Sequence, residues 1–422
     1  MAPSGLAPRR AALDLLMEVT EERRTLAEVM PAVVEALPPA ERARAQRLAT
    51  DTLRWSDRAD RLLGPHLKKR PHPRVLNGLR LAITEIAVHD APPHGVVNAA
   101  VSLSRGHRDT QRAAGMVNAV LRRVAMAQWE TLPPPRLPKR LRAPLVKAYG
   151  KATVDAIEVA HAAGAPLDLT PRDGDAQALA AHLGGRALPT GSVRLASRQQ
   201  VTALPGYDEG TWWVQDAAAA IPARVLAPQP GMRVLDLCAT PGGKTLQLAA
   251  AGAQVTALDV SPSRMTTLTN NLSRTRLSAT QVVADALTWE PDAPFDAILL
   301  DAPCSATGTI RRHPDLPHAK RDGDFAPLIA LQERLLARAS TWLRPGGRLV
   351  YCTCSLLPDE GEVQIERFLS QHGGWAPDHA AYKAQSIAPE WLTPEGIRLH
   401  PALWPEHGGL DGFFIAALIK GN

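Results

Sequence analysis

The 422-residue sequence contains only four cysteines, and all of them lie in its second half. Small secreted domains held together by disulfides are far richer in cysteine, so the sequence is not of that class. No uninterrupted apolar run approaches the roughly 18 residues that a membrane-spanning helix needs. Residues 1–10 lack the long apolar core and the small-residue cleavage pattern of a secretory signal. We therefore expect a cytoplasmic protein with no membrane partner.

Internal repeats and low-complexity tracts are also lacking. The composition, with 45% hydrophobic and 21% charged residues, is that of a globular protein with sizeable cores. At roughly 150 residues per domain, the length suggests two or three domains.

Acidic residues are scarce in the first third of the chain. Residues 1–150 contain 25 Lys and Arg against 14 Asp and Glu, a net charge of +11, whereas the other 272 residues contain 23 against 28, a net charge of −5. A concentration of positive charge in one region is typical of a surface that meets a polyanion such as nucleic acid. The alternative is an ordinary solvated helical surface.

Hydrophobic periodicity predicts an all-α domain over residues 1–138. Three stretches have the i, i+3, i+4, i+7 spacing of half-buried helices, and they lie within residues 26–37, 75–86 and 116–124. Prolines separate these stretches, and no alternating β pattern occurs among them. The Pro-rich stretch Leu132–Pro138 has the composition of a linker.

The rest of the chain predicts two further domains. Residues 139–213 combine two possible helices with short strands, which indicates a small α/β connecting module. From residue 214 to residue 422, short apolar runs alternate with helical segments. This alternation predicts a Rossmann-like α/β domain with a parallel, doubly wound sheet. The candidate strands are 234–237, 255–258, 281–283, 297–300 and 349–351.

A glycine-containing loop follows the first of these strands. It consists of Cys238, Ala239, Thr240, Pro241, Gly242, Gly243 and Lys244. Ligands bind at the carboxyl ends of the strands in such sheets, and a helix that begins after the glycines offers free N–H groups. The second strand ends in Asp259, whose carboxylate can accept both hydroxyls of a ribose. The loop matches neither the dinucleotide fingerprint nor the phosphate loop, because Cys238 and Thr240 replace required glycines. A turn without a ligand is the alternative.

Two cysteines follow two other strands at the same edge of the sheet. The fourth strand ends at Asp301 and continues through Pro303 to Cys304, and the fifth continues to Cys354. A free thiol is more often an inert small side chain, which we expect of Cys238 and Cys352. A four-cysteine zinc site is the other alternative, but the spacings do not suit it.

Two thiols in one pocket suit the chemistry of a cytosine ring. Carbon C5 of cytosine is a poor nucleophile, but addition of a thiolate at C6 turns C5 into an enamine carbon that can attack a methyl donor. A base then removes the C5 proton, and elimination releases the thiol. Asp301 is placed to act as an acid near N3 or to bind a ligand. The spacing does not decide which cysteine attacks.

At these residues the sequence closely resembles the RNA cytosine-5 methyltransferases of the Sun family. The matching stretches are residues 236–245, 299–308, 310–315 and 351–355, together with 214–216 and 411–414 near the two ends of the domain. The first third resembles the RNA-binding fold of the antitermination factor NusB, most clearly at residues 117–122. One departure from the family is the stretch Leu167-Asp168-Leu169-Thr170, where relatives have a Leu-Arg-x-Asn-like pattern. Thr240 and Cys352 are two further departures, because alanine is usual at both positions.

The resemblance implies a role for each matching position. It implies that Cys354 is the covalent nucleophile and that Cys304 assists product release. The loop from Cys238 to Lys244 would hold the methionine end of S-adenosylmethionine, and Asp259 would bind its ribose. Asp285 would lie by the adenine of the cofactor, and Asp301 would lie between the cofactor and the target base. The implied substrate is small-subunit (16S) ribosomal RNA, with no obligate protein partner and no metal.

Two rival functions remain to be separated from this one. A non-catalytic RNA-binding or assembly protein with a vestigial methyltransferase domain would not need the intact Cys354, Cys304, Asp301 and Asp259. An amino-methyltransferase acting on adenine or protein would need no thiols. In the predicted helical domain, we expect Arg122 and Arg123 to contact RNA phosphates. Arg311 and Arg312, beside the Cys304 loop, are separate candidates for contacts to phosphates that flank the target base.

Overall fold

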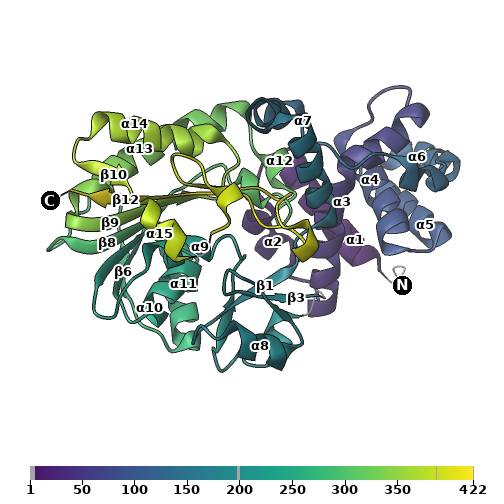
Figure 1. Ribbon diagram of the computed structural model, residues 1–422. Coiled ribbons are helices and arrows are strands. Elements are labelled where there is room, and N and C mark those ends of the chain that lie inside the picture. Colours follow the sequence, from purple (N-terminus) through teal and green to yellow (C-terminus); the bar gives the residue numbers. More distant parts are fainter. Residues whose placement is uncertain (1–4, 197–199, 386, 422) are drawn as a thin grey trace. The chain divides into compact units, whose positions relative to one another are not determined.

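Figure 1 shows the computed structural model of the chain, which describes residues 5–196, 200–385 and 387–421. The chain folds into two compact units. The first, here called the helical unit, comprises Met1–Gly164 and Ile310–Arg321, and the second, the sheet unit, comprises Ala165–Thr309 and Asp322–Asn422. The three domains expected from the sequence, with boundaries at residues 138 and 213, stay a prediction. Within the described residues, no helix combines the length and apolarity of a membrane span.

The helical unit consists of helices throughout its described part, as predicted. Its helices are α1 (Leu6–Thr20), α2 (Leu26–Val34), α3 (Pro39–Leu63), α4 (Pro73–His89), α5 (Pro93–Arg105), α6 (Ala114–Arg123), α7 (Lys139–Ala163) and the short α12 (Leu316–Ala319). The prolines that separate the periodic stretches start helices: Pro39, Pro73 and Pro93 each occupy a first helical position. Proline is favoured there because the N–H that it lacks has no partner within the helix.

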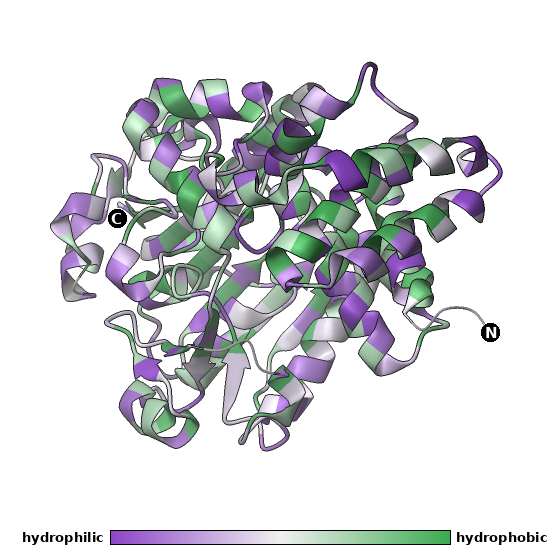
Figure 2. Ribbon diagram, turned by 90° about the vertical axis from the view of Figure 1, so that its right-hand side faces the viewer, coloured by the Kyte–Doolittle hydropathy of each residue, from purple (hydrophilic) through white to green (hydrophobic). Residues whose placement is uncertain are grey.

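Hydrophobic and hydrophilic residues alternate along these helices (Figure 2). The apolar residues form two cores in the helical unit. One lies among α1, α2 and α3 around Leu15 and Leu48, and the other among α3 to α6 around Leu79 and Val120. The predicted stripes therefore face the interior, which confirms the helical periodicity.

The segment Ile310–Arg321 belongs to the helical unit although it is distant in sequence. Asp315 accepts a hydrogen bond from the backbone N–H of Leu26 at 2.9 Å, at the start of α2. Arg140 of α7 donates to the carbonyl oxygens of Pro317 and Lys320. Arg54 of α3 donates to the carbonyl oxygen of Arg311 at 2.8 Å. These contacts join the segment to three helices that precede it by more than 150 residues.

The sheet unit contains two sheets. A four-stranded antiparallel sheet has the order β2-β3-β1-β4, with strands β1 (Leu167–Pro171), β2 (Arg186–Ala187), β3 (Val193–Leu195) and β4 (Trp212–Val214). Helix α8 (Ala176–Leu183) packs on it around Leu169 and Trp212. Short strands and a helix thus occupy this part of the chain, while the module with its boundaries at residues 139 and 213 stays a prediction.

The larger sheet has eight strands and carries the candidate site. Its main path is β10-β12-β9-β8-β5-β6-β7, and β11 pairs with β12. The strands are β5 (Arg233–Leu237), β6 (Gln254–Asp259), β7 (Thr280–Val283), β8 (Phe295–Asp301), β9 (Leu343–Thr353), β10 (Trp375–Pro377), β11 (Ile397–Leu399) and β12 (Phe413–Lys420). The five predicted strands are confirmed as β5 to β9, which pair in parallel.

Helices cover both faces of this sheet (Figure 1). They are α9 (Ile221–Leu226), α10 (Gly243–Ala250), α11 (Pro262–Thr275), α13 (Phe325–Thr341), α14 (Glu362–Gln371) and α15 (His379–Ala384). The core on one side includes Leu248 of α10, and the core on the other side includes Leu335 of α13 and Ile365 of α14. The predicted Rossmann-like fold is confirmed, and the sheet is mixed because β12, which was not predicted, runs antiparallel to β9, β10 and β11.

Candidate active site

The two predicted reactive cysteines lie side by side. Strands β8 and β9 are parallel neighbours in which Asp301 pairs with Cys352, so Cys304 and Cys354 leave the sheet at the same edge. The backbone N–H of Ala302 donates to the carbonyl oxygen of Cys352, and that of Gly308 donates to the carbonyl oxygen of Cys354, both at 2.9 Å. The Sγ atoms of Cys304 and Cys354 are 3.5 Å apart. The structure thus brings together two thiols that are 50 residues apart in the sequence.

A buried carboxylate fastens the two cysteine loops to each other. Glu360 has no exposed surface, and it accepts hydrogen bonds from the backbone N–H of Ser305 at 2.8 Å and from the hydroxyls of Ser305 and Ser355. Gln332 of α13 donates to the same carboxylate at 3.0 Å. Because each serine directly follows a predicted reactive cysteine, Glu360 fixes the positions of both loops. Sequence reasoning missed this residue.

The two thiols differ in their electrostatic surroundings. The hydrogen bond with Cys354, burial, and the negative charges of Cys354 and Glu360 together raise the pKa of Cys304 well above its ordinary value. A thiol with a raised pKa keeps its proton at neutral pH, and this applies to Cys304.

An ion pair lies next to these thiols. The Nζ atom of Lys244, in the first turn of α10, donates to Asp301 at 2.7 Å and lies 5.3 Å from the ring centre of Phe413. Burial alone would lower the pKa of Lys244, but Asp301 and the sulfurs of Cys352 and Cys354 raise it well above its ordinary value. A buried ammonium group thus lies beside Asp301 and interacts with the sulfurs of Cys352 and Cys354.

The glycine-containing loop makes the sharp turn that the sequence predicts between β5 and α10. Gly242 has a φ of +110°, and a Cβ atom there would lie 2.4 Å from the side chain of Leu268. Both the conformation and the space require glycine. The amide of Asn271 donates to the carbonyl oxygen of Pro241 at 3.1 Å, and the backbone N–H of Ala239 donates to the carbonyl oxygen of Leu258. The loop is thereby fixed to β6 and α11.

Asp259 ends β6 beside this loop, and the protein itself occupies both of its oxygens. The Oδ1 atom accepts from the backbone N–H of Ser261 and from Arg264, both at 2.9 Å. The Oδ2 atom accepts from the backbone N–H and the hydroxyl of Thr240. A ribose can bind to this carboxylate only if it replaces some of these donors. Thr240 is therefore a competitor for the predicted ribose acceptor.

Asp236 is a further carboxylate that sequence reasoning did not select. It is fully buried at the end of β5, Thr245 donates to its Oδ2 atom, and its Oδ1 atom has no hydrogen-bond partner among the described residues. Burial raises its pKa to about 7, and the charges of Asp301 and Asp259 act in the same direction. Three carboxylates thus gather at this edge of the sheet, with Lys244 and Arg264 as their cationic partners.

The charge balance of this edge fits S-adenosylmethionine, which carries a sulfonium and an ammonium group. An unpaired buried carboxylate oxygen and three acidic groups favour a cationic ligand. Asp285, expected by the adenine, lies beyond β7, is exposed, and accepts a hydrogen bond from the backbone N–H of Leu287 at 2.9 Å.

The two remaining cysteines have surroundings that disfavour reaction. Burial and the charges of Asp301 and Asp259 raise the pKa of Cys238, and burial and Asp301 raise that of Cys352 well above its ordinary value. A thiol whose pKa is raised carries little thiolate at neutral pH. Within the described residues, no group of three or more Cys, His, Asp or Glu is arranged to hold a metal ion.

The other signature residues hold the sheet unit together. Asp168 forms a buried two-bond ion pair with Arg194 at 2.6 and 2.7 Å, and it also accepts from the backbone N–H of Ala217. Asp216 accepts from the backbone N–H of Asp411 at 3.2 Å, which joins the two ends of this part of the chain. A Cβ atom on Gly308 would lie 2.0 Å from the carbonyl oxygen of Gly412. The unusual Asp168 stretch therefore has a structural role.

The arginines that are expected to contact phosphates differ in their exposure. Arg122 and Arg123 are exposed at the end of α6, as a phosphate contact requires. Arg311 is only 1% exposed, so the expectation of a surface contact is wrong for this residue, and Arg312 is half-buried. The sequence contains no signal of this difference because neighbouring arginines on an irregular segment look equivalent.

Comparisons with known proteins are consistent with both parts of the chain. Residues 6–126 match the NusB family, and residues 223–419 match the family described as 16S rRNA methyltransferase RsmB/F. Among solved structures, PH0851 is similar over 99% of both chains with a TM-score of 0.75 and 22% identity, which shows a common fold. A methyltransferase homolog protein from Pyrococcus horikoshii is 28% identical, with a TM-score of 0.54 over 66% of this chain and 93% of that one.

Two curated relatives are similar over their whole length. Ribosomal RNA small subunit methyltransferase B of Erwinia tasmaniensis is 36% identical over 98% of both chains. The protein of the same name from Xanthomonas campestris pv. campestris is 35% identical over 100% of this chain and 99% of the relative. The chain therefore belongs to the ribosomal RNA small subunit methyltransferase B family, whose members are rRNA methyltransferases.

Proposed function

We propose that the protein transfers a methyl group from S-adenosylmethionine to C5 of a cytosine in small-subunit (16S) ribosomal RNA, through a covalent bond between Cys354 and C6 of the ring. The observation that carries this proposal is the 3.5 Å separation of the Cys304 and Cys354 sulfurs. Methyl transfer to an exocyclic nitrogen or an oxygen needs no thiol. A pair of thiols at the ligand-binding edge suits a ring carbon that must first be activated by addition.

The surroundings of the two thiols favour different roles. The raised pKa of Cys304 means that this thiol holds a proton at neutral pH. Cys354 faces the protonated Lys244, so a negative charge on its sulfur has a cation nearby. We assign attack on C6 to Cys354. Once the methyl group is in place, Cys304 gives its own proton to solvent, the resulting thiolate accepts the proton from C5, and the Cys354–C6 bond breaks with return of its electron pair to sulfur.

Asp301 and Lys244 form the boundary between the thiols and the cofactor loop. The Lys244 ammonium group and the Asp301 carboxylate form an ion pair with a separation of 2.7 Å. In this proposal the carboxylate orients the cytosine amidine edge, and Lys244 holds Asp301 in position. Both groups are on rigid elements, a strand end and the first turn of a helix, which is the arrangement that precise orientation needs.

Residues of the loop from Cys238 to Lys244 would hold the methionine part of S-adenosylmethionine, with Asp259 for the ribose and Asp285 near the adenine. The cofactor, when bound, supplies an electrophilic methyl group. Asp259 becomes available after Arg264, which is more than half exposed, moves away. The helical unit, with its excess of positive charge and the exposed Arg122 and Arg123, would bind the RNA backbone. We expect these reactions to occur in the cytoplasm.

Nucleoside analysis of the product tests the proposal. Small-subunit rRNA from a strain lacking this gene would be incubated with the protein and isotopically labelled S-adenosylmethionine, digested, and examined by mass spectrometry. The expected product is 5-methylcytidine. Label in N4-methylcytidine or in a methylated adenosine would contradict the C5 assignment and favour an amino-methyltransferase. A full-length Cys354→Ala protein serves as the control for contaminating activity.

A further inference from the structure

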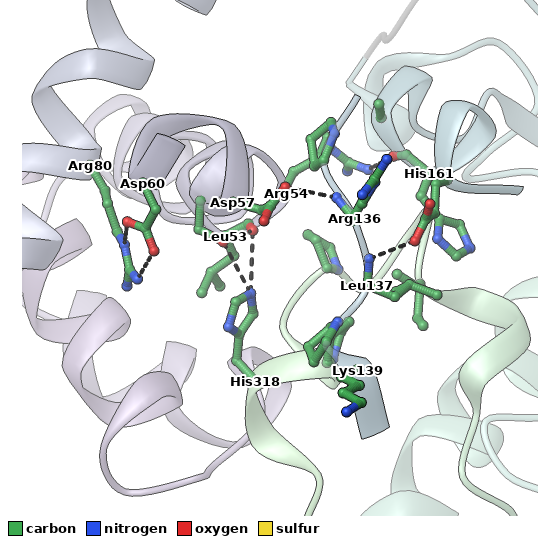
Figure 3. A pocket seen from close by; sticks show the side chains of 18 residues that line it. Leu53, Arg54, Asp57, Asp60, Arg80, Arg136, Leu137, Lys139, His161 and His318 are labelled. Carbon is green, nitrogen blue, oxygen red and sulfur yellow. Dashed lines mark hydrogen bonds and ion pairs between the residues drawn. The ribbon is translucent and has the colours of Figure 1, made fainter. Parts of the chain in front are cut away.

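The hollow among α3, α7 and the Ile310–Arg321 segment has charged groups in its walls that are already paired within the protein (Figure 3). Asp60 accepts two hydrogen bonds from Arg80, at 2.7 and 2.6 Å, and Glu158 accepts one from Arg142 at 3.0 Å. The two predicted reactive thiols of the sheet unit are different, because both are partly exposed and they lie in contact with each other. A small reagent can therefore reach them.

Cys304 and Cys354 are close enough to join as a disulfide. Their Sγ atoms are 3.5 Å apart, and the length of a disulfide bond is about 2.05 Å, so each sulfur has to move by less than about 1 Å. Their loops leave parallel neighbouring strands, which lie about 4.8 Å apart, within the range of Cα separations that a disulfide spans. Glu360 holds the serine that follows each cysteine. The bond can therefore form while both loops keep their anchor.

The other two cysteines are not placed for this reaction. Cys352 is fully buried, and its thiol donates to Asp301 at 3.4 Å. Burial and the charges of Asp301 and Asp259 raise the pKa of Cys238. Since the thiolate is the form that an oxidant attacks, both thiols should react slowly. Oxidation should therefore act on the pair formed by Cys304 and Cys354.

The chemistry of a hydroperoxide suits a pair of this kind. The Cys354 thiolate, which has the Lys244 ammonium group as a cationic neighbour, attacks one oxygen of hydrogen peroxide. The O–O bond breaks, the sulfur becomes a sulfenic acid, and hydroxide leaves. The sulfur of Cys304 then attacks the sulfenic sulfur, the S–O bond breaks, and the leaving hydroxide combines with the proton of Cys304 to form water. Two thiols are thereby oxidised to one disulfide, and the peroxide is reduced to water.

The surroundings of Cys304 favour this order of events. Its pKa is raised by the hydrogen bond with Cys354, by burial, and by the negative charges of Cys354 and Glu360. A sulfenic acid at Cys354 is neutral, so its formation removes one of these negative charges and lowers the pKa of Cys304. The second thiol thus becomes more reactive when the first has been oxidised.

We infer that Cys304 and Cys354 form a reversible disulfide when the protein meets a hydroperoxide, and that this bond switches the active site off. The loss of activity rests on the proposed function, whereas formation of the bond rests on the geometry of the two thiols. Two equivalents of a thiol reductant restore both cysteines and are themselves joined as a disulfide. The switch also protects the nucleophile, because a sulfenic acid that is not resolved proceeds to the irreversible sulfinic acid.

Disulfide mapping tests the bond in the unchanged protein. Full-length protein would be treated with hydrogen peroxide, denatured with iodoacetamide to block the remaining thiols, digested without reductant, and examined by mass spectrometry. We expect a peptide pair linked through Cys304 and Cys354, with the block on Cys238 and Cys352. Blocked Cys304 and Cys354 without a link, or a link to one of the other cysteines, would overturn the inference.

Methyl transfer tests the switch. Peroxide treatment should reduce the rate of label incorporation into rRNA at least about tenfold, and dithiothreitol should restore it to within about twofold of the untreated rate. Cys352→Ala is the matched control, because it removes the neighbouring thiol of β9 and should still form the bond and respond in the same way. Linked protein that yields 5-methylcytidine at the untreated rate would overturn the switch. A labelled nucleoside other than 5-methylcytidine would contradict the proposed function instead, and the mapped bond would be unaffected.

Cys304→Ala tests the protective role of the second thiol. At the same dose of peroxide, about tenfold more of Cys354 should carry two added oxygen atoms in this variant than in the unchanged protein, and dithiothreitol should not remove them. Mass spectrometry of the Cys354 peptide measures this without any need for activity, and thermal melting verifies the fold of the variant. Equal amounts of sulfinic acid in both proteins would show that Cys304 does not resolve the sulfenic acid and would overturn the inference.

Discussion

The cysteine loops after β8 and β9 and the cofactor loops after β5 and β6 lie at the same edge of one sheet but are organised in opposite ways. The cysteine loops are already fixed: Glu360 holds Ser305 and Ser355, and the two sulfurs are in contact. In the cofactor loops, donors of the protein itself occupy the proposed binding group: the carboxylate oxygens of Asp259 accept hydrogen bonds from Thr240, Ser261 and Arg264.

This difference matches what each pair of loops has to do. A covalent step needs a nucleophile and a proton acceptor at fixed positions, and this is worth several orders of magnitude in rate. A dissociable cofactor needs binding groups that can exchange partners when it enters and leaves. We therefore expect a preorganised thiol pair beside a proposed cofactor site that rearranges on binding, and changes on the two sides should have different consequences.

The largest effects are expected from the thiols themselves. Cys354→Ala removes the nucleophile, so turnover should fall by on the order of 10⁴-fold or more and no covalent RNA adduct should form. Cys304→Ala can still attack and methylate, but it cannot complete the release, and it should accumulate an adduct that survives denaturing electrophoresis. Turnover and adduct yield would be measured for both.

Cys238→Ala and Cys352→Ala are the matched controls, and both should form product without a lasting adduct. Adduct in Cys354→Ala alone would exchange the roles of the two loops. Adduct in neither variant, with activity retained in both, would falsify the covalent mechanism and with it the cytosine ring as the substrate.

Glu360→Gln tests whether the cysteine loops depend on a shared anchor. The amide keeps the shape of Glu360 but removes its charge, so kcat should fall about 10- to 100-fold while the KM values for both substrates change little. Since the charge of Glu360 helps to raise the pKa of Cys304, the pKa of this thiol should fall in the variant. The pH dependence of its alkylation measures that shift.

Asp359→Asn is the control, because it makes the same chemical change at the exposed neighbouring residue. A kcat loss of equal size in Asp359→Asn, or an unchanged Cys304 titration in Glu360→Gln, would show that Glu360 acts only on stability. In that case the two loops would not be preorganised by this residue.

The strands and loops of the sheet could be predicted because buried parallel strands have continuous apolar runs and the loops after them have distinctive residues. The ladder from β5 to β9 and the meeting of Cys304 with Cys354 both follow from that pattern. The antiparallel β12 was not predicted. Its eight residues, Phe413–Lys420, are nearly all apolar, and such a run indicates burial but not strand direction.

The interactions between side chains were not predictable in the same way. Glu360 lies in the acidic stretch Pro358–Glu362, which looks like a solvated surface turn, yet it is completely buried. The Lys244–Asp301 pair and the position of the Ile310–Arg321 segment likewise depend on which elements become neighbours in space. Local periodicity contains no information about such long-range contacts.

On the cofactor side, Asp259→Ala should weaken S-adenosylmethionine binding by on the order of 1–3 kcal/mol, through loss of hydrogen bonds to a charged group.

Thr240→Ala should have the opposite effect on cofactor affinity and strengthen binding a few-fold, because it releases Asp259 from the hydroxyl that competes with the ribose. Calorimetry on folded variants measures both. Thr269→Ala, on the exposed part of α11, is a control for loss of a threonine hydroxyl. Weaker binding in Thr240→Ala would mean that this hydroxyl supports the cofactor site and that the site is preorganised after all.

The last effect is a pH dependence of the cofactor side. The pKa of Asp236 is raised to about 7 by burial, so in the folded protein this group stays protonated at pH values where it is ionised in the unfolded chain. Its contribution to stability is therefore complete below the unfolded pKa and is lost as the pH rises through about 7. Between about pH 4.5 and 6.5 this group should lower the free energy of unfolding by about 1 kcal/mol per pH unit.

Affinity for the cationic cofactor should instead increase as the pH passes about 7, because Asp236 becomes ionised. Asp236→Asn should remove both trends, whereas the exposed Asp359→Asn should keep them. Denaturant unfolding and calorimetry over this pH range provide the measurements, and identical profiles for the two variants would exclude Asp236 as the titrating group.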